Sequence, residues 1–167
     1  ESDEGRVARV ATRIRGKGAS EGFTIGIDLG TSNTCVSIVE NGRPRVIPTR
    51  TGASTVPSVL AIVDGQVRVG QAAAKRLVLN PQETIYGSKR LVGRAYSEAL
   101  ADEFQPYFAF PLVETDDHQF GARLPDRVVS FEEVAERLLR EVREVAAEHL
   151  NGSVDRAVVT VPAYFGE

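Results

Sequence analysis

A short polar segment between two apolar stretches carries the clearest chemical signal in this sequence. The segment at 28–34 reads DLGTSNT. Gly30 lets the backbone come close to a bound ligand, because glycine has no side chain to hold it away. The backbone N–H groups of Thr31, Ser32 and Asn33 can donate to phosphate oxygens, and the hydroxyl groups add further donors. The segment therefore favours phosphate binding.

Asp28 ends the first apolar stretch, and its carboxylate calls for a different ligand. The carboxylate repels phosphate because both groups are negative. A Mg²⁺ ion, held directly or through coordinated water, is the ligand that fits it. The other interpretation of the same residues is a polar hairpin turn with a solvated aspartate, and the segment alone favours neither.

Other nucleotide and catalytic motifs do not fit this chain. A G-x-x-x-x-G-K-[ST] loop is absent because Gly16-Lys17 is followed by glycine, and a dinucleotide fingerprint fails because Glu21 stands where its third glycine belongs. Thr34 occupies the second glycine position of a nucleophile elbow, which argues against serine hydrolase chemistry. His118 and His149 are too far apart for a zinc-binding helix motif.

The composition fits one soluble globular domain. The 167 residues are 42% hydrophobic, and 20 basic against 23 acidic residues give a net charge of -3. This balance offers no general attraction for nucleic acid or an anionic membrane. The lone cysteine, Cys35, excludes an internal disulfide and agrees with a reducing compartment. No apolar stretch has the length of a membrane span, so we expect a cytoplasmic protein.

Residues 1–22 differ in character from the rest of the chain. They are polar, contain several glycines and mix basic with acidic side chains, without any aromatic residue. Such a composition is typical of a flexible segment, and we expect an N-terminal arm there. The chain has no methionine, not even at position 1. We therefore expect it to be a processed or excised piece of a longer protein.

The elements that position the polar segment follow from hydrophobic periodicity. Alternating apolar and β-branched residues predict strands in the first half of the chain. The expected strands cover 23–28, 35–39, 44–48, 58–63 and 66–69. Asn41-Gly42 and Asp64-Gly65 are strong signals for tight hairpin turns. The polar segment then connects the first two strands of a three-stranded meander.

The second half of the chain contains the expected helices. The expected elements are helices over 71–79 and 97–104, a hairpin that turns near 116–117, a helix between Ser130 and Asn151-Gly152, and a buried strand over 156–161. Ser130 and Glu133 form a capping box ahead of apolar residues at helical spacing, so the last helix is the clearest. Pro162 ends the last strand because proline cannot donate to a sheet ladder.

Five motifs, spread from Thr24 to Phe165, indicate one family. They are IGIDLGTSN at 25–33, TVPS at 55–58, VGQAA at 69–73, NP at 80–81 with SKRLVGR at 88–94, and VTVPAYF at 159–165. Together they resemble the nucleotide-binding domain of the heat shock protein 70 family, the DnaK type of chaperone. The first motif is shared by actin-like ATPases in general, whereas the stretches at 88–94 and 159–165 are peculiar to these chaperones.

The resemblance implies an α/β, actin-like ATPase fold with a ribonuclease H-like sheet, in which nucleotide lies in a cleft between two lobes. Residues 23–167 would form the first lobe, with a mixed β-sheet and flanking helices, truncated at its C-terminal end. The catalytic glutamate, the second phosphate loop, the adenosine pocket and the peptide-binding domain would follow Glu167. The chain alone would then carry half of a site and lack full ATPase activity.

The resemblance also implies a role for each residue of the polar segment. Asp28 would be a catalytic residue and would hold the hydration shell of Mg²⁺. Thr31 and Ser32 would contact the phosphates of ATP or ADP, and Gly30 and Asn33 would line the same loop. The segment at 28–33 would thus bind both the nucleotide and its metal ion.

Residues outside the loop receive roles from the same resemblance. Lys89 would be the catalytic lysine of the cleft, poised over the γ-phosphate, where it neutralises the charge that spreads in the transition state. Pro162, together with Arg90, would be allosteric and would pass the nucleotide state towards the substrate domain. The alternative interpretations are a basic surface pair at Lys89-Arg90 and a proline that only ends a strand.

The implied function is that of an ATP-dependent molecular chaperone in protein folding and the stress response. ATP hydrolysis with Mg²⁺ would gate the binding of unfolded polypeptides, with a J-domain co-chaperone and a nucleotide exchange factor as partners of the full-length protein. No nucleic-acid or membrane partner is expected. Two alternatives stay open: a naturally short, non-catalytic actin-like binding or regulatory module, and another actin-like enzyme such as a sugar kinase.

Overall fold

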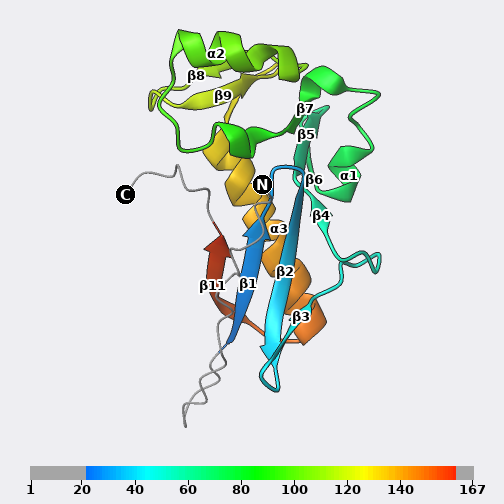
Figure 1. The fold of residues 1–167 in the computed structure, drawn as a ribbon. Coiled ribbons are helices and arrows are strands. Elements are labelled where there is room, and N and C mark those ends of the chain that lie inside the picture. Colours follow the sequence, from blue (N-terminus) through cyan, green and yellow to red (C-terminus); the bar gives the residue numbers. More distant parts are fainter. Residues whose placement is uncertain (1–21, 161–167) are drawn as a thin grey trace, which may run out of the picture.

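The protein is described by a computed structural model that covers residues 22–160. Within this range three β-sheets surround one long helix, α3 (Phe131–Leu150), which runs behind the largest sheet towards the other two (Figure 1). Helix α3 contacts strands of all three sheets. The predicted arm at 1–22, apart from its last residue, and Pro162 lie outside the described residues.

The largest sheet contains the polar segment and has a mixed topology. Its strands are β1 (Phe23–Leu29), β2 (Asn33–Glu40), β3 (Arg43–Val46), β4 (Val56–Pro57) and β11 (Val154–Thr160). The order is β11-β1-β2-β3, with β4 paired to β2. Strand β1 runs parallel to β11 and antiparallel to β2. The predicted mixed sheet and its β1–β2–β3 meander are confirmed.

Two smaller sheets and several short helices complete the described part. One sheet has the order β6-β5-β7, the other β10-β9-β8. Their strands are β5 (Val59–Val63), β6 (Gln66–Val69), β7 (Thr84–Tyr86), β8 (Leu112–Glu114), β9 (Phe120–Arg123) and β10 (Val128–Ser130). The short helices are α1 (Gln71–Ala74), α2 (Glu98–Phe104) and the 3-10 turns η1 (Pro81–Glu83), η2 (Ser88–Arg90) and η3 (Gln105–Tyr107). The predicted hairpins at 64–65 and 116–117 are present.

Helix α3 anchors the largest sheet. Apolar residues of β1 and β2 alternate towards the helix, and Ile25, Val36, Val142 and Val145 share one buried core. Burial of such side chains is the main favourable term in folding, at about 25 cal/mol per Å² of apolar surface. The long helix therefore holds the strands that flank the polar segment in place.

Both ends of α3 follow from their capping residues. The Ser130 hydroxyl accepts a hydrogen bond from the Glu133 N–H at 3.0 Å, and Asn151 ends the helix in the left-handed conformation at φ 49. The Glu133 carboxylate pairs with Arg127 instead of reaching back to the cap. The predicted helix is confirmed, with one half of the capping box formed.

The helix predicted over 71–79 is too long. Helix α1 ends at Ala74, and two of the following backbone N–H groups bond to carbonyls three residues back, as in a 3-10 helix. Val78 and Leu79 are 88% and 72% exposed. Short helices depend on tertiary burial of their apolar face, and these two side chains have none among the described residues.

The last strand, predicted to be buried over 156–161, is an exposed edge strand. Strand β11 begins at Val154 and pairs with β1 alone among the described residues. Only Val154 is fully buried in β11, and Val158 is 40% exposed. The apolar run predicts a strand correctly. Whether that strand is buried depends on which other elements cover it, and the residues of the run do not specify those elements.

Candidate functional site

The loop between β1 and β2 is tight enough to require glycine at position 30. An added Cβ at Gly30 would lie 2.1 Å from the carbonyl oxygen of Asn33. Glycine is therefore required at position 30 because the backbone of Asn33 comes close to it. Within residues 22–160, the backbone N–H groups of Thr31 and Ser32 have no hydrogen-bond acceptor. These two donors suit an anion.

A buried serine between β4 and β5 clamps this loop. Ser58 is 4% exposed, and its hydroxyl donates to the Gly30 carbonyl at 2.8 Å and lies 3.0 Å from the Thr34 hydroxyl. The Ser58 backbone N–H donates to the Ser32 carbonyl at 2.9 Å. Three hydrogen bonds thus hold the loop from one residue. Hydrogen bonds of buried groups restrain geometry because leaving them unmade is costly.

Asp28 is oriented by a threonine from the far end of the chain. The Thr160 hydroxyl donates to Asp28 Oδ1 at 2.7 Å. The two residues pair across the parallel strands β1 and β11, so both lie at the same edge of the sheet. Asp28 is exposed, and its Oδ2 accepts no hydrogen bond from any described residue. That oxygen is open to a cation or to a water bound to one.

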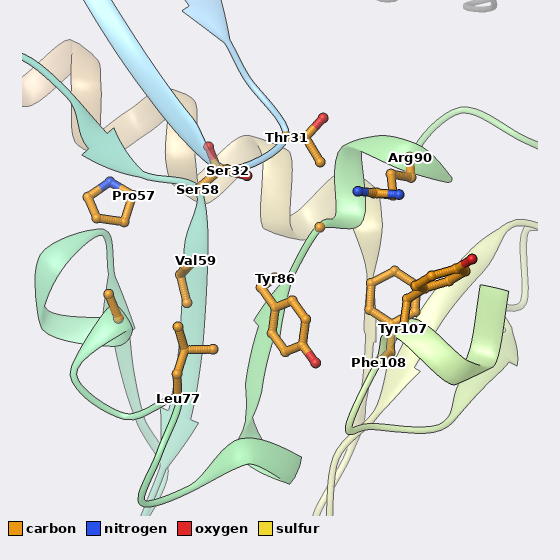
Figure 2. Close-up of a pocket in the computed structure, with 12 residues that line it drawn as sticks. Thr31, Ser32, Pro57, Ser58, Val59, Leu77, Tyr86, Arg90, Tyr107 and Phe108 are labelled. Atoms are coloured by element: carbon orange, nitrogen blue, oxygen red, sulfur yellow. The ribbon is translucent and has the colours of Figure 1, made fainter.

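A cavity of about 470 Å³ lies against the loop (Figure 2). Thr31 and Ser32 line one end, and the aromatic side chains of Tyr86 and Phe108 line another part. Arg90 of η2 lies at the rim, with its guanidinium 6.0 Å from the centre of the Tyr107 ring. The remaining lining residues are Pro57, Ser58, Val59, Ala74, Leu77, Gly87 and Tyr107. The structure therefore brings Arg90 and the loop together.

Comparison with known protein families agrees with this geometry. A family model described as Hsp70 protein matches residues 24–167. The chain belongs to the Hsp70 family. The match includes the loop, Ser58 and both residues of the Asp28–Thr160 pair. The mixed α/β structure fits an actin-like ATPase lobe of that family, and the resemblance drawn from the sequence motifs is confirmed.

The Hsp70 chain places its other predicted site residues less closely together. Lys89 lies on η2 next to Arg90 but is not among the residues that line the cavity, so its role stays a prediction. Asn33 is exposed at the start of β2 and pairs with Pro57 of β4. Pro162 lies outside the described residues.

Sequence reasoning missed two residues of this site. Ser58 and Thr160 each stood in a family motif, at 55–58 and 159–165, but neither was given a role in the site. The only local signal for Ser58 is a polar residue next to a run of apolar ones, at the start of a buried strand. Thr160 lies 132 residues from its partner. Neither contact can be inferred from hydrophobic periodicity, which reports local structure alone.

The donor set of the Hsp70 loop fits Mg²⁺ held mostly through water. Within residues 22–160 no three His, Cys, Asp or Glu side chains cluster to hold a metal ion. Mg²⁺ keeps several waters and binds through one or two carboxylates together with substrate phosphates. One exposed carboxylate, that of Asp28, beside a loop with two unpaired backbone N–H groups satisfies that requirement.

Cys35 lies beside Asp28 and is poorly suited to act as a nucleophile. The two residues face each other across β1 and β2. Burial raises the pKa of the Cys35 thiol, and the Asp28 carboxylate raises it further. The thiol is therefore protonated at neutral pH, and the thiolate is the reactive form.

Among the helices at 22–160, none has the length and apolar character needed to cross a membrane.

Proposed function

We propose that the β1–β2 loop binds the phosphates of ATP and that Asp28 holds the accompanying Mg²⁺ through water. The observation that carries this proposal is the clamped loop, in which two unpaired N–H groups lie beside a carboxylate that Thr160 orients. Membership of the Hsp70 family supports ATP as the nucleotide and hydrolysis as the reaction of the full-length protein.

Each loop residue then has a chemical task. The N–H groups and hydroxyls of Thr31 and Ser32 donate to phosphate oxygens, and Gly30 allows the tight turn that presents them. Asn33 lines the same loop. Asp28 Oδ2 accepts a hydrogen bond from a coordinated water. Mg²⁺, when bound, neutralises phosphate charge and supplies the rigid positioning on which phosphoryl transfer depends.

Three residues beyond the loop extend this proposal. Lys89 neutralises charge on the γ-phosphate and so acts as a catalytic residue of the full-length ATPase. Arg90 and Pro162 transmit the nucleotide state. Membership of the Hsp70 family supports these assignments, and all three residues fall within the matched range.

We further propose an actin-like, ribonuclease H-like fold, with residues 23–167 as the first lobe and 1–22 as an arm. The full-length protein would be a cytoplasmic chaperone that gates the binding of unfolded polypeptides, assisted by a J-domain co-chaperone and a nucleotide exchange factor. The mixed sheet around α3 supports the lobe assignment.

The test is an NMR titration of the 167-residue chain with Mg²⁺–ATP. Because Asp28 and Ser32 are exposed to solvent, which screens charge interactions, we expect a Kd on the order of 1 mM. The amide signals of Thr31 and Ser32 should shift. Asp28→Asn should weaken binding in the presence of Mg²⁺, whereas Asp64→Asn, in an exposed turn of another hairpin, should leave it unchanged. Shifts that avoid the loop, or that survive Asp28→Asn unaltered, would contradict the proposal.

A further inference from the structure

The cavity beside the loop has an aromatic wall, and phosphate binding does not require these aromatic side chains. Its volume of about 470 Å³ lies within the range of small-molecule sites, about 300–1,000 Å³. Figure 2 shows the Tyr86 ring between Phe108 on one side and Val59 and Leu77 on the other, and Val59 is the strand neighbour of Tyr86. Such a continuous apolar surface suits a flat hydrophobic group.

The aromatic wall is held in place without any ligand. The Tyr86 hydroxyl accepts a hydrogen bond from the Ala109 N–H at 3.1 Å. The Tyr86 ring contacts Phe108 and Phe110, with centroid distances of 5.8 and 5.7 Å. Phe108 in turn contacts Phe131 of α3. The aromatic side chains are therefore already ordered before a ligand enters. This favours binding, because no further entropy is lost in ordering them.

Charge is found at one end of the cavity only. Arg90 is the single charged residue among those that line it, and no described carboxylate forms an ion pair with Arg90. The hydroxyls of Thr31 and Ser32 lie at the loop end and add uncharged donors. A guanidinium binds planar oxyanions well because its N–H groups form a rigid fork.

We propose that this cavity binds a small aromatic anion, namely a flat ring system that carries a carboxylate or sulfonate. The ring lies against Tyr86 and Phe108, and the anionic group faces Arg90. Asp28 is not among the lining residues, so this site is separate from the metal-binding edge. Because Thr31 and Ser32 belong to both, an occupied cavity restrains the loop that binds phosphate.

The probe for a first test is naphthalene-2-sulfonate, a rigid aromatic anion. Its size of about 14 non-hydrogen atoms corresponds to a Kd on the order of 1 mM at ordinary ligand efficiency. The neutral naphthalene-2-sulfonamide has nearly the same shape and serves as its control. Both are titrated into the 167-residue chain without Mg²⁺ or nucleotide, and binding is followed by amide chemical shifts.

We expect the amides of Leu77, Tyr86 and Thr31 to shift with one common Kd. The sulfonamide should bind about fivefold more weakly than the sulfonate, since it lacks the charge that Arg90 attracts. Arg90→Gln should remove this difference by weakening the sulfonate alone. Arg123→Gln, which removes an exposed cation elsewhere, should preserve it.

A second variant tests the apolar part of the cavity. Ala74→Leu places extra volume at the lining and should weaken both probes at least threefold, with the amide spectrum outside the cavity unchanged. Equal affinity of the two probes for the unaltered chain, or shifts confined to exposed Val78 and Leu79, would overturn the proposal. Asp28→Asn should affect Mg²⁺–ATP but not naphthalene-2-sulfonate, so this proposal and the proposed function can fail separately.

Discussion

Replacing Ser58 by alanine should destabilise the protein far more than the removal of one oxygen atom from the side chain suggests. The substitution removes hydrogen bonds to the Gly30 carbonyl and the Thr34 hydroxyl, at 2.8 and 3.0 Å. Each contributes about 1 kcal/mol net, and a buried group left without a partner costs about 1–3 kcal/mol more. Thr34 is 0% exposed, so its hydroxyl cannot turn to bulk water.

The expected loss for Ser58→Ala is therefore about 3–5 kcal/mol of unfolding free energy. At about 2–4 °C per kcal/mol for a domain of this size, the melting temperature should fall by about 6–20 °C. Urea unfolding followed by circular dichroism measures the free energy, and a thermal melt measures the temperature. The matched control is Ser32→Ala, an exposed serine in the same loop, for which we expect less than about 0.5 kcal/mol.

A double mutant separates the hydrogen bond from packing effects. Thr34→Val keeps the shape of the side chain and removes the hydroxyl that Ser58→Ala leaves unpaired. The double mutant should then lose less than the sum of the two single losses. If Ser58→Ala destabilises no more than Ser32→Ala, or if the two losses simply add, the clamp does not stabilise the loop as described.

Four further predictions concern the loop and its neighbours. Gly30→Ala should cost about 1–3 kcal/mol and shift the loop amide signals, because its Cβ would lie 2.1 Å from the Asn33 carbonyl oxygen; an unchanged melt would contradict this. Thr160→Val should weaken Mn²⁺-induced broadening near Asp28 at least threefold, while Thr160→Ser, which keeps the donor, should not. Alkylation of Cys35 by iodoacetamide at pH 8 should be slower than that of a peptide thiol and faster in Asp28→Asn, because the carboxylate helps to keep the thiol protonated; equal rates would refute that cause. In the full-length protein, Lys89→Ala should lower single-turnover hydrolysis by about 10²–10³-fold with a smaller change in nucleotide affinity, and unchanged hydrolysis would exclude Lys89 from the mechanism.

Local sequence determined the elements around the candidate site. The β1–β2–β3 meander, the turn at Asn41-Gly42 and the cap of α3 at Ser130 all appear where the residues predict them. Each depends on interactions between residues close together in the chain, such as alternation, left-handed turn conformations and capping hydrogen bonds. The motifs also identify the Hsp70 family, because a motif is a local pattern too.

Contacts between distant residues depended on the tertiary structure. The clamp of Ser58 on Gly30, the orientation of Asp28 by Thr160 and the aromatic cavity under Arg90 join residues that lie far apart in the chain. The exposure of β11 and the early end of α1 have the same origin, since both depend on which surfaces the rest of the fold covers. Periodicity shows which side of an element is apolar but not what packs against it, so the sequence predicted the loop while only the folded chain showed what holds it.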